Sequence, residues 1–363
     1  MTRFPLFDKQ DDSGALFAEP FGWQVPRPYL DIAEEYFSAR NAAVMMKRSY
    51  FGHLHITGND HVDLLHRLTT NELRTLKPGE GQINIFANEK GRIIDRVILQ
   101  AFSDSILLTT SPGNAERVAE WIEKYIFIED VKVENLATAL TTLSLFGPVS
   151  ATILNGFFSG DFTSLQTCHH NKIDWRGNTI IVSSSDELGI PGFDLIVATG
   201  HAHQLWDELF ASGRQFDLKP MGDAAYDVLR IEAGWPIYGR DFDEEINPHE
   251  AGMSSNIDFN KGCYIGQEVI ARLDTYDKVQ KHLMGVIFEG DALPKFRDPI
   301  FMEGLEVGYL TSVGYSFGMQ KSLALGYVRT KFAIAGGEVQ AGSDDNQRCG
   351  HLVKLPFKIA TPV

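Results

Sequence analysis

Cysteine is scarce in this chain of 363 residues, and its three cysteines, Cys168, Cys263 and Cys349, lie far apart. This spacing excludes a disulfide framework and a zinc site built from paired cysteines. No apolar run approaches the roughly 20 residues needed to cross a bilayer. The acidic N-terminus has neither the apolar core of a signal peptide nor the composition of an organelle transit peptide. We therefore expect a soluble cytoplasmic protein with no membrane partner.

Basic charge is also in deficit. The chain has 33 Lys and Arg residues against 48 Asp and Glu residues, which gives a formal net charge of -15. Because sequence-independent binding to nucleic acid depends on Lys and Arg neutralising phosphates, we expect no broad nucleic-acid binding. Apolar residues make up 44% of the chain, enough for a large core, and the length suggests two or three domains.

Short strands and helices interleave through the first part of the chain. Residues 51–58 alternate apolar and polar side chains, as in a half-buried strand. A helix then begins at Asn59 or Asp60, with His66 expected on its solvent side. Short loops and hairpin-like pairs favour an α+β arrangement over a doubly wound parallel sheet. After Lys281, short strands punctuated by glycine indicate a small antiparallel barrel or sandwich.

The segment Lys261–Glu268 is dense in reactive groups and has neither helix nor strand periodicity. Gly262 and Gly266 permit backbone angles closed to other residues, so the segment can wrap closely around a ligand or present the Cys263 thiol at a turn. Lys261 could stabilise a thiolate if the loop folds its ammonium group back toward the sulfur. The alternative is a buried structural cysteine in a tight turn.

The same segment reads Lys-Gly-Cys-Tyr-x-Gly-Gln-Glu. It resembles the signature of the YgfZ-type folate-binding proteins, relatives of the glycine-cleavage aminomethyltransferase that act in iron-sulfur protein maintenance. The resemblance implies that Cys263 is a catalytic residue. It also implies an α+β fold, with an aminomethyltransferase-like folate-binding body of several subdomains around a central cavity, plus a C-terminal antiparallel β-barrel. The expected domains are an N-terminal arm of unknown role (1–40), the folate-binding domain (41–280) and the barrel (281–363).

The stretch Asn88–Arg96 is, taken alone, a β-hairpin with charged ends. It resembles the aminomethyltransferase segment Asn-x-x-Gly-Gly-x-x-Asp-Asp, in which an aspartate of the final pair acts near the folate nitrogen that receives the one-carbon unit. The resemblance implies that Asp95 is catalytic and that Asn88 lines the folate pocket. Arg92 and Arg96 replace the second glycine and the second aspartate. Because a guanidinium cannot serve as the base, both weigh against methylene transfer by the family mechanism.

Asp194 lies in a Gly-Phe-Asp sequence that resembles the family's Gly-Phe-Glu segment, whose acid binds the pterin ring. A carboxylate can accept two parallel hydrogen bonds from the pterin N3–H and 2-amino groups. The resemblance therefore implies that Asp194 binds the cofactor. The alternative is an acid at the entry of a strand, after a Pro-Gly turn.

Arg230 lies in a predicted helix whose sequence, Arg-x-Glu-Ala-Gly followed by Tyr-Gly-x-Asp, resembles another family segment. The resemblance implies that Arg230 lies near the benzoyl-glutamate part of folate, since a guanidinium can grip a carboxylate in two places. We also assign Tyr238 and Lys261 to folate binding. The alternative for Arg230 is a structural salt bridge to Glu232 or Asp227.

The sequence Cys168-His169-His170 contains two kinds of good metal ligand. Three consecutive residues point in different directions, however, and no partner at customary ligand spacing lies nearby. We therefore predict no metal site.

The resemblance implies tetrahydrofolate or a folate derivative as cofactor, and iron-sulfur proteins as partners. The first hypothesis is a tetrahydrofolate-binding accessory factor for iron-sulfur cluster assembly or repair in client enzymes, including those that modify transfer RNA. In it the Cys263 thiol ligates iron or undergoes redox exchange. The alternative is a tetrahydrofolate-dependent aminomethyltransferase or demethylase, which Asp95 favours. A third possibility is a folate-binding module whose cysteine is inert.

Overall fold

The chain forms two compact units in the computed structural model, which describes residues 17–18, 25–26, 29–276, 278–342 and 347–359. The first unit contains the chain up to Asn84 and Asp95–Tyr226, and the second contains Ile85–Ile94 and Asp227–Val363. A short hairpin from the N-terminal part of the sequence therefore belongs to the same unit as the C-terminal part.

Part of the predicted N-terminal arm, residues 1–40, lies outside the described residues. Within it the structure shows a two-stranded sheet of β1 (Phe17–Ala18) and β2 (Val25–Pro26), followed by helix α2 (Ile32–Asn41). Asp31 caps this helix, because its carboxylate accepts a hydrogen bond from the backbone N–H of Ala33 at 2.9 Å.

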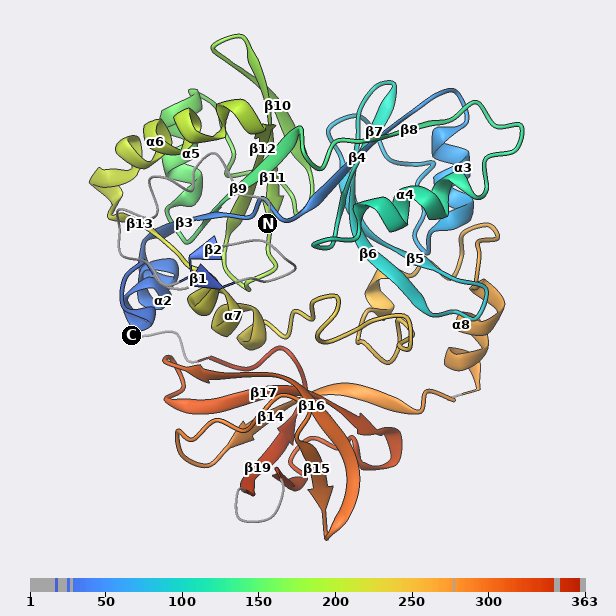
Figure 1. Cartoon of the computed structure of the whole chain (residues 1–363), viewed down its shortest axis with the longest axis vertical. Helices are drawn as coiled ribbons and strands as arrows, with labels where there is room; N and C mark the ends of the chain where they lie inside the picture. The colour runs from blue at the N-terminus through green and yellow to red at the C-terminus, as the bar shows by residue number, and fades with distance from the viewer. Residues whose placement is uncertain (1–16, 19–24, 27–28, 277, 343–346, 360–363) are drawn as a thin grey trace. The chain divides into compact units, whose positions relative to one another are not determined.

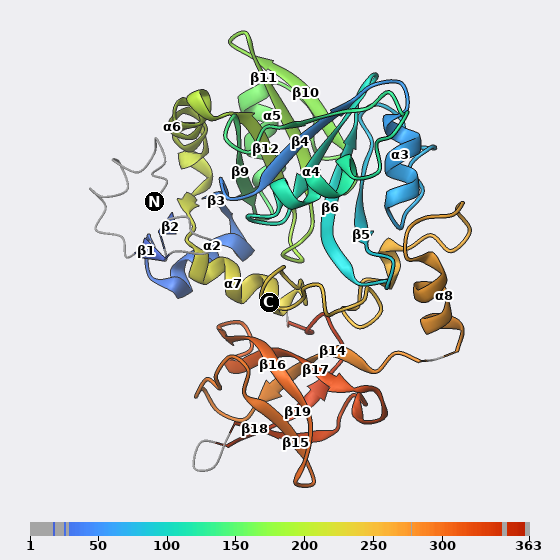
Figure 2. The same cartoon turned by 45° about the vertical axis from the view of Figure 1, so that its right-hand side comes forward.

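A six-stranded sheet dominates one part of the first unit, with strand order β10-β11-β12-β9-β3-β13. Its neighbouring strands are antiparallel, except that β13 pairs with β3 in parallel. Helices α5 (Ser150–Phe158) and α6 (Ala202–Gly213) lie against one face of the sheet (Figures 1 and 2). The strands are β3 (Ala43–Lys47), β9 (Leu140–Phe146), β10 (His170–Trp175), β11 (Asn178–Ser185), β12 (Gly192–Ala198) and β13 (Leu218–Pro220).

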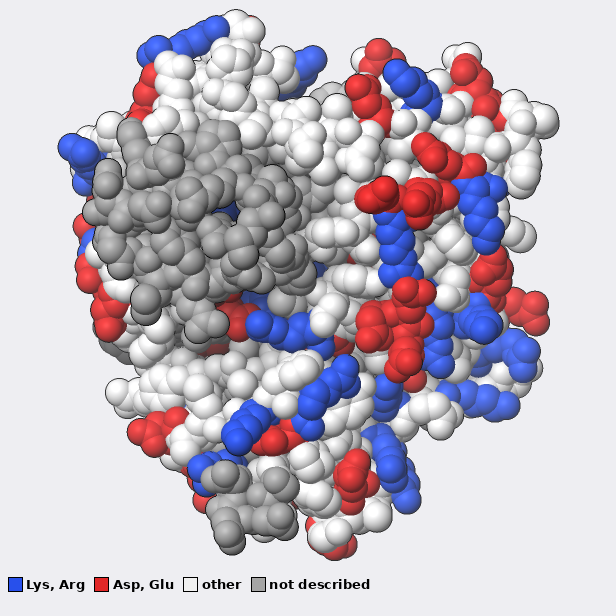
Figure 3. All heavy atoms as spheres, viewed as in Figure 1, with Lys and Arg blue, Asp and Glu red and all other residues white. Residues whose placement is uncertain are grey.

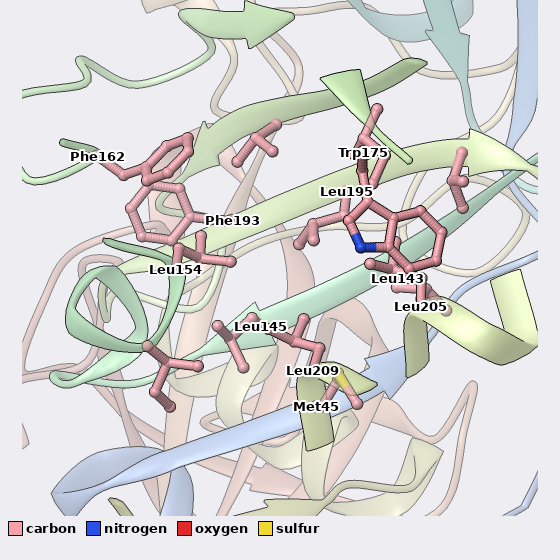
Figure 4. Close-up of a cluster of buried hydrophobic side chains, with 14 of the residues drawn as sticks. Met45, Leu143, Leu145, Leu154, Phe162, Trp175, Phe193, Leu195, Leu205 and Leu209 are labelled. Atoms are coloured by element: carbon pink, nitrogen blue, oxygen red, sulfur yellow. The ribbon is translucent and has the colours of Figure 1, made fainter. Parts of the chain in front are cut away.

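The helix-covered face of this sheet is apolar. Leu143 and Leu145 are two residues apart in β9, and Leu195 of β12 lies opposite Leu143, so all three point to the face that the helices cover. There they meet Leu205 and Leu209 of α6 in a continuous core (Figure 4). Burying each of these leucines contributes about 1.5–3 kcal/mol. The opposite face carries the polar side chains of Ser144 and Asp194 beside apolar ones.

A five-stranded sheet with order β5-β6-β7-β4-β8 forms the rest of the first unit, and its strands β5 and β6 continue into the second unit. Its strand β4 confirms the strand predicted over residues 51–58, although His53 of the polar face is buried as well, and α3 confirms the helix predicted after it. The elements are β4 (Gly52–Thr57), α3 (His61–Leu68), β5 (Gly81–Ala87), β6 (Ile93–Ala101), β7 (Ser105–Thr110), α4 (Ala115–Glu123) and β8 (Lys132–Asn135).

The predicted solvent position of His66 is wrong. Its side chain is 1% exposed, because the chain after α3 folds back over that side of the helix. Glu72 places Oε1 3.0 Å from His66 Nδ1, and the backbone N–H of Leu73 lies 3.5 Å from the same nitrogen. The helical period alone could not predict that His66 is buried, since the residues that bury it lie outside the helix.

The second unit contains a closed antiparallel barrel with strand order β14-β17-β16-β15-β18-β19. The hairpin Ile85–Ile94 also belongs to this unit, and its residues Ile85 and Ile93 join Ile231 and Phe242 in one apolar core. The remaining elements are α7 (Asp223–Glu232), which begins in the first unit, α8 (Gln267–Thr275), β14 (Lys281–Phe288), β15 (Pro299–Met302), β16 (Leu305–Ser316), β17 (Lys321–Arg329), β18 (Glu338–Ala341) and β19 (Arg348–Val353).

The predicted α+β fold with a C-terminal antiparallel barrel is confirmed. The first strand of the barrel, β14, begins at Lys281. Whether residues 41–280 and 281–363 are separate folding domains stays a prediction. Among the described residues, no helix has both the length and the apolar character needed to span a membrane.

Candidate functional site

The polar face of the six-stranded sheet carries a group of charged side chains. Ser144 of β9 lies opposite Asp194 of β12 in the strand register, and Arg48 directly follows β3. Side chains alternate between the two faces of a strand. Because Leu143 and Leu195 point into the core, their neighbours Ser144 and Asp194 point away from it.

Arg48 holds this group together, and its side chain is only 1% exposed. Its Nε donates a hydrogen bond to Ser144 Oγ at 2.8 Å, and its Nη2 donates to both carboxylate oxygens of Asp194, at 2.9 and 3.0 Å. Its Nη1 forms an ion pair with Glu187 and donates to the Tyr226 hydroxyl at 3.3 Å. The Ser144 hydroxyl in turn donates to Asp194 Oδ1 at 2.5 Å. We call these five residues the Arg48 cluster.

The Arg48 cluster leaves one carboxylate charge in excess. Burial raises the pKa of Glu187 above its ordinary value, although the adjacent Arg48 acts in the opposite direction. The Asp194 side chain is 13% exposed, and among the described residues its Oδ2 accepts a hydrogen bond from Arg48 alone. A carboxylate oxygen has two acceptor positions, so Asp194 keeps capacity to bind a donor group of a ligand.

Asp95 of β6 is a fully buried carboxylate with an unused oxygen. Its Oδ2 accepts a hydrogen bond from the backbone N–H of Ser111 at 3.0 Å, whereas its buried Oδ1 accepts none from any residue that the structure describes. Burial raises the pKa of Asp95 to about 6, against the lowering effect of the hydrogen bonds from Ser111 and Asn114. A carboxyl group that titrates near neutral pH suits general acid-base chemistry.

Asn88 shapes the hairpin of the second unit. Its side-chain Oδ1 accepts hydrogen bonds from the backbone N–H groups of Lys90 and Arg92, at 2.9 and 3.0 Å. Arg92 extends from this turn to form an ion pair with Glu250, at 3.1 Å. Asn88 therefore has a turn-forming role in the structure, and its predicted contact with folate stays a prediction.

The Cys263 segment, Lys261–Glu268, lies against the turn of that hairpin. A Cβ added to Gly266 would lie 2.5 Å from the backbone oxygen of Asn88, and one added to Gly91 would lie 3.1 Å from the Ile270 side chain. Both glycines also have positive φ angles, +83° and +67°. Two motifs that are far apart in the sequence thus meet at a contact that only glycine permits.

The Cys263 thiol is exposed, while its neighbours are anchored. Tyr264 is buried together with Ala87 and Ile270, and the ammonium group of Lys261 lies 5.2 Å from the centre of the Tyr264 ring. Lys261 thus makes a cation-π contact with Tyr264, and its predicted role in cofactor binding stays a prediction. The expected alternative of a buried structural cysteine does not fit Cys263.

Arg230 is fully buried in an ion-pair network of the second unit. Its Nε donates to Asp227 at 2.6 Å, its Nη1 to Asp241 at 2.8 Å, and its Nη2 to Ser312 at 2.8 Å. The salt bridge to Asp227, which the sequence left as an alternative, is therefore present. Tyr238 packs edge-on against Phe242, with ring centres 5.7 Å apart. Folate contacts of Arg230 and Tyr238 stay predictions.

The Cys168 segment shows no metal-binding arrangement. Cys168 is buried, and burial raises the pKa of its thiol to about 12, so the thiol stays protonated. Across the part of the chain that the structure describes, no group of three or more His, Cys, Asp and Glu side chains is placed to hold a metal ion.

The sequence did not reveal four members of the Arg48 cluster, namely Arg48, Ser144, Glu187 and Tyr226. Arg48 follows the apolar strand Ala43–Met46, and a buried position for such a residue requires charged partners. Those partners come from strands and loops more than 90 residues away. The one available signal was an arginine directly after a strand whose first four residues are apolar.

Two family models match the chain. The model of the GCVT N-terminal domain covers residues 6–261, and that of the glycine cleavage T-protein C-terminal barrel domain covers residues 281–358. A solved structure, the glycine cleavage system aminomethyltransferase T from Bartonella henselae, has a TM-score of 0.90 and 23% sequence identity, and the match covers 98% of each chain. At that identity the likeness establishes the fold.

Curated relatives extend over nearly the whole chain. The aminomethyltransferase of Caldanaerobacter subterraneus subsp. tengcongensis is 27% identical, over 94% of this chain and 91% of its own. That of Leptospira biflexa is 30% identical, over 92% and 90%. A putative chloroplastic transferase of Arabidopsis thaliana is 33% identical, over 87% of this chain and 72% of its own. With the first family model covering well over half of its length, the chain belongs to the glycine cleavage T-protein family.

Proposed function

We propose that this chain binds a reduced folate and transfers to it the one-carbon unit of an aminomethyl donor. Asp95 carries the proposal, because a buried carboxylate with an unused oxygen and a pKa of about 6 can accept a proton from a folate amine. In the transfer, the methylene carbon replaces the two amine hydrogens of the folate. One of these hydrogens returns to the donor, and the other leaves with the amino group as ammonia.

Folate as the acceptor is supported by the polar face of the six-stranded sheet. Asp194 is held rigidly by Arg48 and Ser144, and its Oδ2 can still accept a hydrogen bond. A pterin ring presents N–H donors at its pyrimidine edge, which match a carboxylate. Relatives that cover most of this chain are named aminomethyltransferases, which agrees with the same acceptor.

Titration calorimetry under anaerobic conditions tests the folate site. We expect tetrahydrofolate and 5-formyltetrahydrofolate to bind more tightly than oxidised folate. Asp194→Asn should weaken the binding of tetrahydrofolate by about 2 kcal/mol, because hydrogen bonds to a buried charged acceptor are lost. Cys263→Ser is the matched control and should bind like the wild type. Failure of every folate to bind to the wild type would contradict the proposal.

The pH dependence of the unfolding free energy gives a second test, which concerns Asp95. The folded-state pKa of about 6 lies above the ordinary value of 3.8, so the ionised form of Asp95 destabilises the fold, and this penalty is complete above pH 6 and absent below about pH 4. The stability of Asp95→Asn relative to wild type should therefore rise by about 3 kcal/mol as the pH increases from 4 to 7. Denaturant unfolding of both proteins across this range measures the difference.

The transfer activity should rise with pH, whereas the stability of the wild type falls. Tetrahydrofolate-dependent release of ammonia from an aminomethylated thiol should rise as the pH passes about 6, and Asp95→Asn should reduce it about a hundredfold. A variant that is more stable but equally active would show that Asp95 is not the base.

We propose iron-sulfur maintenance, the role of the YgfZ-type branch, as a second candidate function. The observation that favours it is the exposed Cys263 thiol on a segment held by Gly266 and Tyr264, a placement that the transfer chemistry does not use. In cells that lack the protein, Cys263→Ser should then fail to restore the activity of an iron-sulfur enzyme that modifies transfer RNA, although its folate affinity is intact. Full restoration by this variant would contradict the second candidate.

A further inference from the structure

The loop between α4 and β8 exposes two adjacent large apolar side chains. Phe127 is 80% exposed and Ile128 is 96% exposed, whereas the other exposed large apolar residues of the described chain reach at most 66%. This loop projects from the sheet beside α3 (Figure 1). Isolated exposed apolar residues are ordinary, but two neighbours that are almost fully exposed indicate a contact surface. We call Phe127 and Ile128 the apolar tip.

The apolar tip is held in its conformation by polar contacts. Glu129 Oε2 accepts hydrogen bonds from the backbone N–H groups of Phe127 and Ile128, at 2.9 and 3.1 Å, and its Oε1 accepts one from Arg67 at 2.8 Å. These contacts lower the pKa of Glu129 to about 2, with the Arg67 hydrogen bond as the largest cause. The carboxylate therefore stays charged at any physiological pH.

The next residue, Asp130, fixes the other side of the tip. Its carboxylate accepts hydrogen bonds from the backbone N–H and the side-chain amide of Asn59, at 3.1 and 2.7 Å. The backbone N–H of Asp130 donates to the Asp60 carboxylate at 2.7 Å. Because the loop is already ordered, it loses little conformational entropy when a partner binds to the tip.

A row of glutamates precedes the tip on α4. Glu116, Glu120 and Glu123 occupy the exposed face of the helix, opposite its buried residues Val118 and Ile122. Within the described chain, none of the three forms an ion pair with another residue. In the space-filling view acidic side chains lie over α4 with basic ones among them (Figure 3), since α4 also carries Arg117 and is followed by Lys124. Their spacing of four and three residues places the row along about 10 Å of the helix axis.

We propose that the apolar tip and the glutamate row form one docking surface for a basic amphipathic helix of a partner protein. Apolar residues of that helix pack on Phe127 and Ile128. Lysines or arginines spaced four and three residues apart pair with Glu116, Glu120 and Glu123.

Charge selects this partner over the other candidates. Anionic lipid and nucleic acid are repelled by the glutamates. A second copy of the chain would bring two glutamate rows together if it docked through the same surface. A basic helix is attracted to the row and also offers an apolar stripe to the tip.

Fluorescence anisotropy with a labelled helical peptide of leucine and lysine tests the proposal. Phe127→Ser/Ile128→Ser should weaken peptide binding about tenfold, and Glu120→Gln/Glu123→Gln should weaken it and reduce its dependence on salt. The matched control is Leu293→Ser/Phe296→Ser, which removes an exposed apolar pair elsewhere and should bind like the wild type. Thermal unfolding of each variant checks that its fold is intact.

Three results would overturn the proposal. The first is equal affinity of the wild type and the tip variant, and the second is no binding of the peptide to the wild type. The third is binding of the wild type, but not of the tip variant, to vesicles of phosphatidylserine and phosphatidylcholine, since the tip would then be a membrane contact.

Discussion

Arg48→Met is expected to lower the unfolding free energy by about 3–5 kcal/mol, because it leaves two buried carboxylates without their common partner. Glu187 and Asp194 both form ion pairs with Arg48, and the three side chains are at most 13% exposed. Methionine fills much of the same volume but supplies no hydrogen-bond donor. The loss should shrink as the pH falls, because burial raises the pKa of Glu187 and its protonation removes one unpaired charge.

A neutral version of the Arg48 cluster separates the effect of charge on stability from the effect of packing. Arg48→Met/Glu187→Gln/Asp194→Asn removes all three charges together, and it should recover most of the lost stability. Urea unfolding at pH 8 and pH 5 measures all three proteins. If the single and triple variants were equally unstable, the loss would come from packing around Arg48, and the electrostatic account of the Arg48 cluster would be wrong.

Gly266→Ala is expected to destabilise the second unit by about 3 kcal/mol, the sum of two effects. A side chain at φ +83° costs roughly 1–2 kcal/mol in the left-handed region. The new Cβ would also lie 2.5 Å from the Asn88 carbonyl oxygen, a backbone atom that cannot move away freely, and such overpacking costs about 1–3 kcal/mol.

Gly252→Ala provides the matched control for this substitution. Gly252 belongs to the same unit and has a similar φ of +73°, but a Cβ there would meet nothing within 4 Å. It should therefore show only the conformational cost. Thermal unfolding compares the two variants, and the rate at which Cys263 reacts with a thiol reagent reports whether the segment has shifted. Equal effects of the two substitutions would contradict the close approach of Gly266 to the hairpin.

The sequence predicted the elements whose boundaries depend on local chemistry. Strand β4 lies within the predicted strand over residues 51–58, and helix α3 follows it as expected. The short strands after Lys281 form the predicted barrel. The solvent exposure predicted for His66 was wrong, because residues after the helix bury its side chain and helical periodicity does not describe them.

The candidate site was predicted less completely, because its geometry depends on contacts between distant residues. Arg48 and Glu187 are 139 positions apart, and no motif joins them. For Arg230 the sequence offered Glu232 or Asp227 as a partner, and only the folded helix shows the contact with Asp227. The glycines of the Cys263 segment predicted a close approach, but they could not show that the Asn88 carbonyl occupies the space.

The hairpin Ile85–Ile94 has a consequence for how the protein is made. Its residues Ile85 and Ile93 pack against Ile231 and Phe242, which leave the ribosome much later. At about 5–20 residues per second, the hairpin waits about 7–30 s for this core. During synthesis the nascent first unit must therefore carry an unburied apolar hairpin. A fragment that starts at Asp227 would lack one strand pair of its own core, so the two units cannot be separated by a single cut in the gene.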